Sequence, residues 1–397
     1  MNIGVYLKDT YTQRGRSSTL EWTNDLAKQG HSIYFLFPRD VKEMQWREAP
    51  YIPQFSEFFR EPNNQLSRYQ VDMSNLRKIR KQFSDQPPSS WYKRLRGESH
   101  EHVQQANELL TRKKRELEAF RKDWVDEQFP YTAKNPSLDM LLFRKAGRYF
   151  QRDNAQQVRA IADAYPAAGQ INDAQLVAGM DKTFMNRLDS EYSLETHFPA
   201  SIEGVVDSVQ YFQDAIVKPL DGRAGRGVAR ISATSDGLAY IQQTSKGVRT
   251  QHLDSAGLEK QLAGIREEDP RVVVQRYEPR IQAEGELRVM VVGGEPVGCV
   301  VTRPRGEEAF LSNVARGASA HELTEVPGYA QEAVDYLVSF MRQNNISVAR
   351  GDLIGSRINE INLVSPGTKA FGKNRSRLRK KLVEVVEEYP GVTAQAS

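Results

Sequence analysis

One lysine and three glycines in the middle of the chain form the first candidate site. Lys218 ends an apolar run that begins at Ala215, which is typical of a short buried strand, and Gly222, Gly225 and Gly227 follow closely. Glycine lets the backbone adopt positive φ and approach a ligand, and successive N–H groups in such a loop bind anions. Because Lys218 can add a point charge, the stretch predicts a phosphate site. A plain glycine-rich hairpin has comparable weight, since the spacing is not that of a P-loop.

A second group of polar residues stands on two predicted strands near the C-terminus. The stretch Gly351-Asp-Leu-Ile-Gly-Ser-Arg-Ile-Asn-Glu-Ile-Asn362 predicts two strands around a tight turn. Asp352 lies on the first strand, and Glu360 and Asn362 share one face of the second. Two carboxylates and an amide oxygen are hard ligands that suit Mg²⁺, which also binds phosphate oxygens. A solvated polar face explains the hairpin alone equally well, but with the phosphate loop it indicates nucleotide chemistry.

These stretches occur with two others in an order that resembles the ATP-grasp ligases. The members most similar to the chain are bacterial glutathione synthetase and the glutamate ligases that modify a ribosomal protein. The resemblance runs from about residue 138 to residue 371 and is faint over residues 1–40. It rests on Lys218-Pro-Leu-Asp-Gly222, Val274-Gln-Arg-Tyr277, Arg288-Val-Met-Val-Val-Gly-Gly-Glu-Pro-Val297 and Asn359-Glu-Ile-Asn-Leu-Val-Ser-Pro366.

The resemblance implies a role for each matching residue. Lys182 and Lys218 would contact the ATP phosphates, and Glu286 would hold the ribose hydroxyls. Arg288 and Arg303 would lie near the phosphates, although a surface ion pair also explains either arginine. The backbone of the hinge at residues 275–277 would pair with adenine. The complete set is catalytic residues Arg288, Arg303 and Asn313, cofactor-binding residues Lys182, Lys218, Asp221, Gly222, Gly225, Gly227, Gln275, Arg276, Tyr277, Glu278 and Glu286, and metal ligands Asp352, Glu360 and Asn362.

The implied reaction joins a carboxylic acid to an amine. The acid attacks the γ-phosphate of ATP, and the amine then captures the acyl phosphate, which yields an amide, ADP and phosphate. Such phosphoryl transfer depends on positioning and on positive charge, and no convincing Ser–His or Cys–His nucleophile is evident. The expected cofactors are ATP and Mg²⁺, with Mn²⁺ as an alternative metal. The expected partners are a small carboxylic acid or peptide and an amine or amino acid.

Three other functions stay open on the sequence. A glutamate ligase that acts on a protein or peptide fits the same motifs. A non-catalytic ATP-binding protein would use its basic residues to bind RNA or protein, although the intact metal-type residues argue against it. A glycosyltransferase often opens on a similar N-terminal unit. Leu311 stands where glutathione synthetase has an arginine, so the expected acid is a peptide or an amino-acid derivative other than γ-glutamylcysteine.

The elements that position these residues predict an α/β protein with an α+β lid. A strand at 3–7, a helix at 18–29 and a strand at 31–37 form a βαβ unit, which predicts a parallel sheet. The resemblance then implies an ATP-grasp fold with this N-terminal parallel-sheet domain and an inserted helical arm. The expected domains are residues 1–40 with 136–172 (N-terminal substrate domain), 41–135 (arm), 173–272 (ATP-grasp lid) and 273–397 (C-terminal domain with the metal site).

The arm contains the strongest helical signal of the chain. Apolar residues recur at three- and four-residue steps over residues 101–128, and a second helix at 73–83 could pair with it as an antiparallel arm. Basic runs at 77–81 and 112–115 lie on their exposed faces. Solvated helix faces explain these runs, and the alternatives are contact with a large substrate, cover of the active site or a homo-oligomer interface.

Composition narrows the class of protein. The chain has 397 residues, enough for two or three domains, and 55 basic residues nearly balance 51 acidic ones, which does not point to nucleic acid. The first residues predict a strand and not a signal peptide, and no apolar run reaches membrane-spanning length. The single cysteine, Cys299, rules out an internal disulfide. We therefore expect a cytoplasmic protein.

Overall fold

The computed structural model divides the chain into two compact units. The first comprises Met1–Asn2 and Asp9–Ser137, and the second comprises Ile3–Lys8 and Leu138–Ser397. The chain contains both helices and β-strands, as predicted for an α/β protein. The structure describes residues 1–7, 18–53, 71–75, 95–129, 131–134, 136–144, 152–220, 225, 227–244, 247–265, 271–306, 308–312, 318–363 and 369–389.

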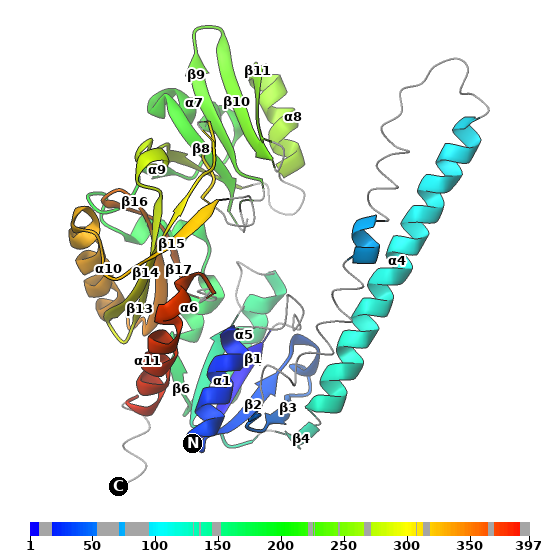
Figure 1. The fold of residues 1–397 in the computed structure, drawn as a ribbon, viewed down its shortest axis with the longest axis vertical. Coiled ribbons are helices and arrows are strands. Elements are labelled where there is room, and N and C mark those ends of the chain that lie inside the picture. The colour runs from blue at the N-terminus through cyan, green and yellow to red at the C-terminus, as the bar shows by residue number, and fades with distance from the viewer. Residues whose placement is uncertain are drawn as a thin grey trace. The chain divides into compact units, whose positions relative to one another are not determined.

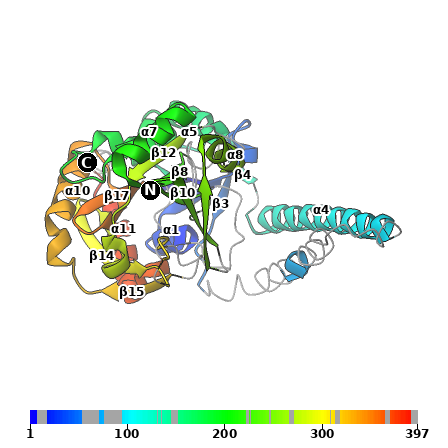
Figure 2. The ribbon, with the colours of Figure 1, turned by 90° about the horizontal axis from the view of Figure 1, so that it is seen from above.

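The first unit combines three antiparallel strands with a 34-residue helix, α4 (Figures 1 and 2). β2 pairs with β3, and β3 pairs with β4. β3 and β4 lie near the two ends of the predicted arm of residues 41–135, and both are strands of this sheet. The elements are α1 (Ser18–Lys28), β2 (Ser32–Leu36), the 3₁₀ turn η1 (Pro38–Asp40), β3 (Gln45–Ala49), α4 (Leu95–Gln128) and β4 (Tyr131–Lys134).

Helix α4 contains the predicted helix and begins six residues earlier. Leu110, Leu117 and Val125 are buried on one side of it, while Arg112 and Arg115 are exposed, which is the amphipathic pattern of the sequence. Residues 71–75 are helical, and the rest of the helix predicted at 73–83 lies outside the described residues. None of the described helices has the length and apolar character that a bilayer crossing requires.

The second unit begins with parallel strands, as predicted for the N-terminal domain. β1 pairs in parallel with β5, and β5 pairs in parallel with β6. Tyr6 on β1 donates a hydrogen bond to Asn154 on α5, which fixes the helix over these strands. The elements are β1 (Asn2–Leu7), β5 (Met140–Arg144), α5 (Arg152–Ala164), β6 (Gly169–Ile171), α6 (Ala174–Gly179) and the 3₁₀ helix η3 (Lys182–Arg187).

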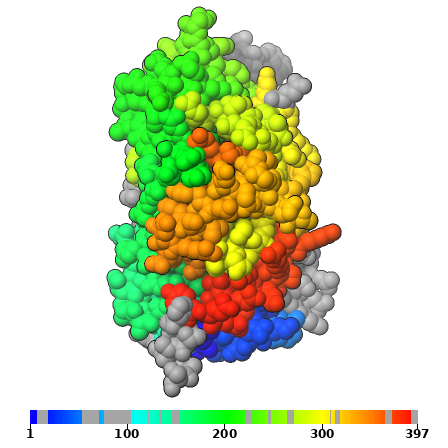
Figure 3. Space-filling view, turned by 90° about the vertical axis from the view of Figure 1, so that its left-hand side faces the viewer, coloured from blue at the N-terminus to red at the C-terminus, as the bar shows by residue number. Residues whose placement is uncertain are grey.

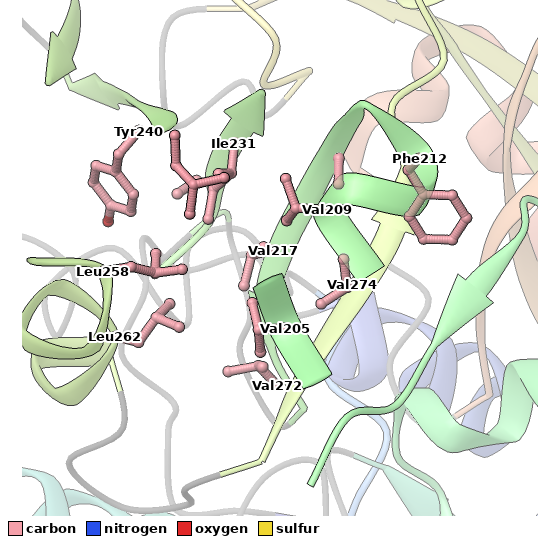
Figure 4. Packing of buried hydrophobic residues seen from close by; sticks show 13 residues of the cluster. Val205, Val209, Phe212, Val217, Ile231, Tyr240, Leu258, Leu262, Val272 and Val274 are labelled. Atoms are coloured by element: carbon pink, nitrogen blue, oxygen red, sulfur yellow. The ribbon is translucent and has the colours of Figure 1, made fainter. Parts of the chain in front are cut away.

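A second sheet, here called the lid sheet, has the strand order β11-β10-β9-β8-β12-β7. Two helices, α7 and α8, bury the apolar core of this region against the sheet (Figure 4). Val205 and Val209 of α7 and Leu258 and Leu262 of α8 are fully buried. The elements are β7 (Thr196–His197), α7 (Ile202–Phe212), β8 (Asp214–Pro219), β9 (Ala229–Thr234), β10 (Gly237–Thr244), β11 (Gly247–Leu253), α8 (Ser255–Ile265) and β12 (Val272–Arg276).

A third sheet, here called the C-terminal sheet, is antiparallel with the order β15-β14-β13-β16-β17. Gly293 and Gly294, both at positive φ, turn β13 into β14, and helices α10 and α11 form part of the surface in Figure 3. Cys299 is buried in β14, and this burial raises the pKa of its thiol to about 11. The elements are α9 (Arg280–Ala283), β13 (Glu286–Val292), β14 (Glu295–Arg303), β15 (Ser319–Leu323), η5 (Gly328–Ala330), α10 (Gln331–Gln343), β16 (Val348–Ile354), β17 (Arg357–Asn362), η6 (Lys369–Asn374) and α11 (Arg375–Glu387).

Candidate active site

A pocket in the second unit lies between the lid sheet and the C-terminal sheet. Its empty space, with the open solvent at its mouth included, is about 900 Å³. Strands β8 and β12 supply one wall, and β13, β16 and β17 supply the other. Twelve of the residues predicted from the sequence line it: Lys182, Lys218, Gly225, Gln275, Arg276, Tyr277, Glu278, Glu286, Arg288, Asp352, Glu360 and Asn362.

Lys218 is held by two amide side chains. It lies at the end of β8 and is buried, and its Nζ donates to Gln275 Oε1 at 3.0 Å and to Asn359 Oδ1 at 3.4 Å. Burial lowers the pKa of Lys218, and the nearby carboxylates of Glu360, Glu286 and Asp352 act in the opposite direction. Both of these partners are neutral, so an anionic ligand would be the better partner for the buried ammonium group.

Lys182 reaches the same end of β8 from a different element. Asp181 caps the helix η3 that carries Lys182, and the buried Lys182 Nζ donates to the backbone carbonyls of Pro219 and Leu220 at 2.9 and 3.2 Å. These carbonyls follow Lys218 directly in the chain. The structure therefore brings together two lysines that are 36 residues apart in sequence, at the start of the predicted phosphate loop.

A buried carboxylate organises the opposite wall. Glu286 Oε2 accepts hydrogen bonds from Arg288 Nη2 at 2.7 Å and from Ser312 Oγ at 2.7 Å, while Glu286 Oε1 accepts from Asn359 Nδ2 at 3.0 Å. Burial alone would raise the pKa of Glu286, but Arg288, Ser312 and Arg350 outweigh it and the pKa lies below its ordinary value. With both oxygens engaged by protein donors, Glu286 orients Arg288, and its predicted ribose contact stays a prediction.

The predicted metal ligands face the pocket beside an arginine that the sequence reasoning missed. Asp352 pairs with Glu360 across β16 and β17, and Arg350 pairs with Asn362. The guanidinium of Arg350 binds both oxygens of Asp352 at 2.6 Å, and Asn362 Nδ2 donates to Asp352 Oδ2 at 3.3 Å. Burial opposes the charge of Arg350, but Asp352, Glu286 and Glu360 outweigh it and raise the pKa of Arg350.

The chemistry of this donor set fits a hard divalent cation. Carboxylate oxygens of Asp352 and Glu360 and an amide oxygen of Asn362 are the ligands Mg²⁺ prefers. A cation that used Asp352 would have to share that carboxylate with Arg350. No cluster of three or more His, Cys, Asp or Glu side chains suited to a metal occurs among the residues that the structure describes, and the metal site stays a prediction.

An apolar region adjoins the charged part of the pocket. Leu194, Tyr277, Leu311 and Ile354 belong to one buried cluster, against which Ile216 packs. Such a surface suits a flat aromatic ring. The backbone N–H groups of Arg276 and Tyr277 donate to the carbonyls of Glu195 and Asp214, respectively. A base at the predicted hinge would therefore pair with other backbone groups, such as the N–H of Glu278.

Not every predicted site residue reaches the pocket. Arg303 is exposed at the end of β14 and is not among the described residues that line the pocket. Glu286 pairs with Thr302, and adjacent residues of a strand face opposite sides, so Arg303 points away from the face that carries Glu286. Its catalytic role stays a prediction without structural support. Gly225 and Gly227 both have a φ of 68°, whereas Asp221, Gly222 and Asn313 lie outside the described residues.

Sequence reasoning gave no role to three residues that organise the pocket. Arg350, Ser312 and Asn359 each bond to a predicted site residue. Arg350 had a usable signal, because it stands directly before the predicted strand and two residues from Asp352, and residues two apart on a strand share a face. Ser312 and Asn359 carried no such signal, since a loop serine and an asparagine in a strand have many ordinary explanations.

Comparison with known proteins gives matches over this part of the chain. Residues 181–371 match the model of the prokaryotic glutathione synthetase ATP-grasp domain. Glutathione synthetase of Parasynechococcus marenigrum (strain WH8102) is 32% identical over 172 residues, which are 42% of this chain and 49% of the relative. Glutathione synthetase of Neisseria meningitidis serogroup B (strain MC58) is 29% identical over 153 residues, 38% of this chain and 41% of the relative. The chain thus spans about half the length of the curated relatives it matches.

A solved structure extends the similarity of fold to the whole chain. D-alanine–D-alanine ligase from Bacillus anthracis, in complex with ATP, has a TM-score of 0.52 and 12% identity, covering 100% of this chain and 97% of that one. At this identity the likeness concerns the fold alone.

Proposed function

We propose that the chain is an ATP-dependent carboxylate–amine ligase, from the premise that residues 181–371 match the model of the prokaryotic glutathione synthetase ATP-grasp domain. The observation that carries the proposal is the composition of one pocket. Lys218, Arg288 and Arg350 face it together with the oxygen-bearing residues Asp352 and Glu360, beside an apolar surface. Cations and metal-type oxygens around one cavity are what transfer of a phosphoryl group requires.

ATP would bind with its base on the apolar surface and its phosphates toward β8. Ile216 and Tyr277 would contact the base, and Lys182 and Lys218 would bind the phosphate oxygens. Gln275 supports this arrangement, because its Oε1 accepts from Lys218 and its Nε2 donates to Thr196 at 3.1 Å. A lysine held by a fixed amide keeps its position when the phosphate arrives, which reduces the cost of ordering it on binding.

Arg288 and Arg350 would stabilise the negative charge that develops during transfer. Each guanidinium is fixed by a carboxylate, Arg288 by Glu286 and Arg350 by Asp352. Cations that are positioned before the reaction need no reorganisation in the transition state. The acid substrate would attack the γ-phosphate to form an acyl phosphate, and the amine would displace phosphate from that intermediate to form the amide.

Asp352, Glu360 and Asn362 would hold a divalent cation, with Mg²⁺ the expected metal and Mn²⁺ an alternative. When bound, such a cation neutralises phosphate charge and aligns the phosphate chain for in-line displacement. Asp352, Glu360 and Asn362 stand on two paired strands, β16 and β17, and these strands position their side-chain oxygens. We propose a small carboxylic acid or a peptide as acceptor, and an amine or amino acid as its partner.

Isotope transfer tests the proposal. The chain is incubated with ATP, Mg²⁺ and a library of amino acids and short peptides, and products are identified by mass spectrometry. For an active pair, acid labelled with ¹⁸O in its carboxylate should place one label in the released phosphate, with ADP as the other product. Release of AMP and pyrophosphate, or phosphate without label, would contradict the acyl-phosphate reaction. Binding of ATP without turnover of any pair would favour a non-catalytic ATP-binding protein.

A further inference from the structure

The loop after β14 is held at four successive residues by side chains from outside it. Gln282 Nε2 donates to the carbonyl of Ala309. The N–H groups of Phe310 and Leu311 donate to Gln243 Oε1 at 2.9 and 2.8 Å. At Ser312, the hydroxyl donates to Glu286 and the carbonyl accepts from Arg288 Nη2 at 3.5 Å. Residues 309–312 are thereby tied to α9, β10 and β13.

Gln243 provides the contact between the lid sheet and this loop. It lies on β10, is 7% exposed, and uses one oxygen to accept both N–H groups. Phe310 and Leu311 belong to a buried apolar cluster. The two bonds satisfy backbone donors in this cluster, and unsatisfied buried donors are costly. The position of the loop therefore depends on the position of β10.

Ser312, the next residue of the loop, reaches the wall of the pocket that carries Glu286 and Arg288. Ser312 and Arg288 share the same oxygen of Glu286, at 2.7 Å each. A displacement of the loop would move Ser312, change the hydrogen bonding of the carboxylate, and release Arg288 from its present orientation. A continuous chain of contacts thus leads from a lid strand through three loop residues to a cation of the pocket.

We propose that Gln243 is a positioning residue that couples the lid sheet to Arg288. The inference rests on the proposed ligase function, because it assigns to Arg288 the stabilisation of the transferred phosphoryl group. With β10 in place, the amide oxygen of Gln243 holds Phe310 and Leu311, and Ser312 then fixes the Glu286 carboxylate. With β10 displaced, the loop loses its two lid contacts and the arginine is no longer oriented for reaction.

Three variants separate this role from a general contribution to stability. Gln243→Met keeps the length of the side chain and removes the acceptor, while Gln243→Glu keeps an oxygen that can accept both N–H groups. Gln242→Leu is the matched control, since Gln242 is the neighbouring glutamine on β10 and its side chain is exposed. Thermal unfolding shows first that each variant is folded. Amide exchange at Phe310 and Leu311, ATP affinity by calorimetry, and kcat with KM for the active pair are then measured.

In the Gln243→Met variant, we expect amide exchange at both positions to rise by about tenfold or more, and kcat to fall by about tenfold, with ATP affinity within about threefold of wild type. Gln243→Glu should restore most of the protection and of kcat, and Gln242→Leu should resemble wild type. Faster exchange with unchanged kcat would overturn the coupling. Equal losses of kcat and ATP affinity, or a Gln243→Glu variant no better than Gln243→Met, would show a merely structural contact.

The experiment also distinguishes this inference from the proposed function. Absence of turnover in the wild-type chain would contradict the ligase activity, and this inference with it. Wild-type turnover together with a fully active Gln243→Met variant would contradict the role of Gln243 alone. Ser312→Ala adds a further check, because residues that act in one chain of contacts are not additive. The double variant with Gln243→Met should lose little more kcat than the worse single variant.

Discussion

Two buried polar networks in this protein are built from the same residue types but differ in their surroundings. In the second unit, Arg288 and Arg350 pair with Glu286 and Asp352 on the wall of a pocket. In the first unit, Arg47 is fully buried on β3 and pairs with Asp40 at 3.1 Å and with Asp126 at 2.8 Å. Both networks place guanidinium groups against carboxylates away from bulk water.

The network around Arg47 is completed by contacts to backbone and aromatic groups of the protein. Its Nη1 donates to the carbonyl of Phe129 at 2.8 Å, and the guanidinium lies 3.6 Å from the centre of the Tyr131 ring. Tyr131 in turn donates to Asp40 at 2.7 Å. These contacts join β3, η1, β4 and the end of α4, which is the arrangement of a structural tie. A buried charge of this kind is tolerated because Arg47 is paired with Asp40 and Asp126 and also donates hydrogen bonds to Asp40 and Phe129.

The pocket network instead leaves its charged groups beside empty space. Lys218 donates to neutral amides, and Glu360 faces the cavity. The comparison teaches that a buried arginine–carboxylate pair does not by itself identify a functional site. What distinguishes the functional candidate is a cavity that lets a ligand complete the network. The following predictions are ordered from the largest expected effect to the smallest.

Glu360→Gln should remove turnover and leave the fold intact. The substitution keeps the shape of the side chain and removes one charge from the proposed metal ligands, so turnover should fall by at least about 100-fold. Thermal unfolding should stay within about 2 °C of wild type, because the residue is only partly buried. Glu295→Gln is the control, since Glu295 is an exposed carboxylate paired with Lys381. Wild-type turnover of Glu360→Gln at ordinary Mg²⁺ would contradict the metal assignment.

Arg47→Met should have the opposite profile, with lost stability and unchanged ATP affinity. Removal of the guanidinium leaves Asp40 buried without its main partner, which costs about 3–5 kcal/mol. All four tryptophans, Trp22, Trp46, Trp91 and Trp124, belong to the first unit, so tryptophan fluorescence in a denaturant titration reports the unfolding of that unit.

The control for this measurement is a less buried arginine of the same network. Arg39 is 25% exposed and pairs with Asp126 at 2.7 Å, so Arg39→Met should cost only about 1 kcal/mol. A loss below about 1 kcal/mol for Arg47→Met, or a large fall in ATP affinity of the folded variant, would contradict the distinction between the two networks.

Arg350→Lys tests whether this arginine belongs to the chemistry or only holds Asp352. A lysine keeps the charge but cannot bind both oxygens of a carboxylate at once, so the cation and Asp352 should both lose their fixed positions. We expect turnover to fall by about 10- to 100-fold, with ATP affinity within about threefold of wild type. If turnover is unchanged, the bidentate pair with Asp352 has no part in the reaction.

The sequence predicted the fold class, which is confirmed, and a resemblance to the ATP-grasp ligases, which a family model matches over residues 181–371. Their signals are local: a βαβ pattern at the N-terminus, glycines after Lys218, and alternation that puts Glu360 and Asn362 on one face. The sequence also predicted most pocket residues. It failed where a role depends on contacts far apart in the chain. Gln243 bonds to residues 67 and 68 positions away, and no pattern of spacing marks such a pair. Arg303 was predicted as a catalytic residue from the resemblance alone. The face of the sheet to which it points became clear only from the pairing of β13 with β14.

The basic run on α4 should contribute least to nucleotide binding. Arg112 is 65% exposed and pairs with Glu116, as does Lys113, and exposed pairs of this kind contribute little. None of the described residues that line the pocket comes from the first unit. Replacement of Arg112, Lys113, Lys114 and Arg115 by glutamine should therefore change ATP affinity by less than about twofold in calorimetry at physiological salt. A fall of tenfold or more in a variant with unchanged tryptophan fluorescence would show that the arm takes part in nucleotide binding. A changed preference among acid substrates at constant ATP affinity would instead assign the arm to substrate choice.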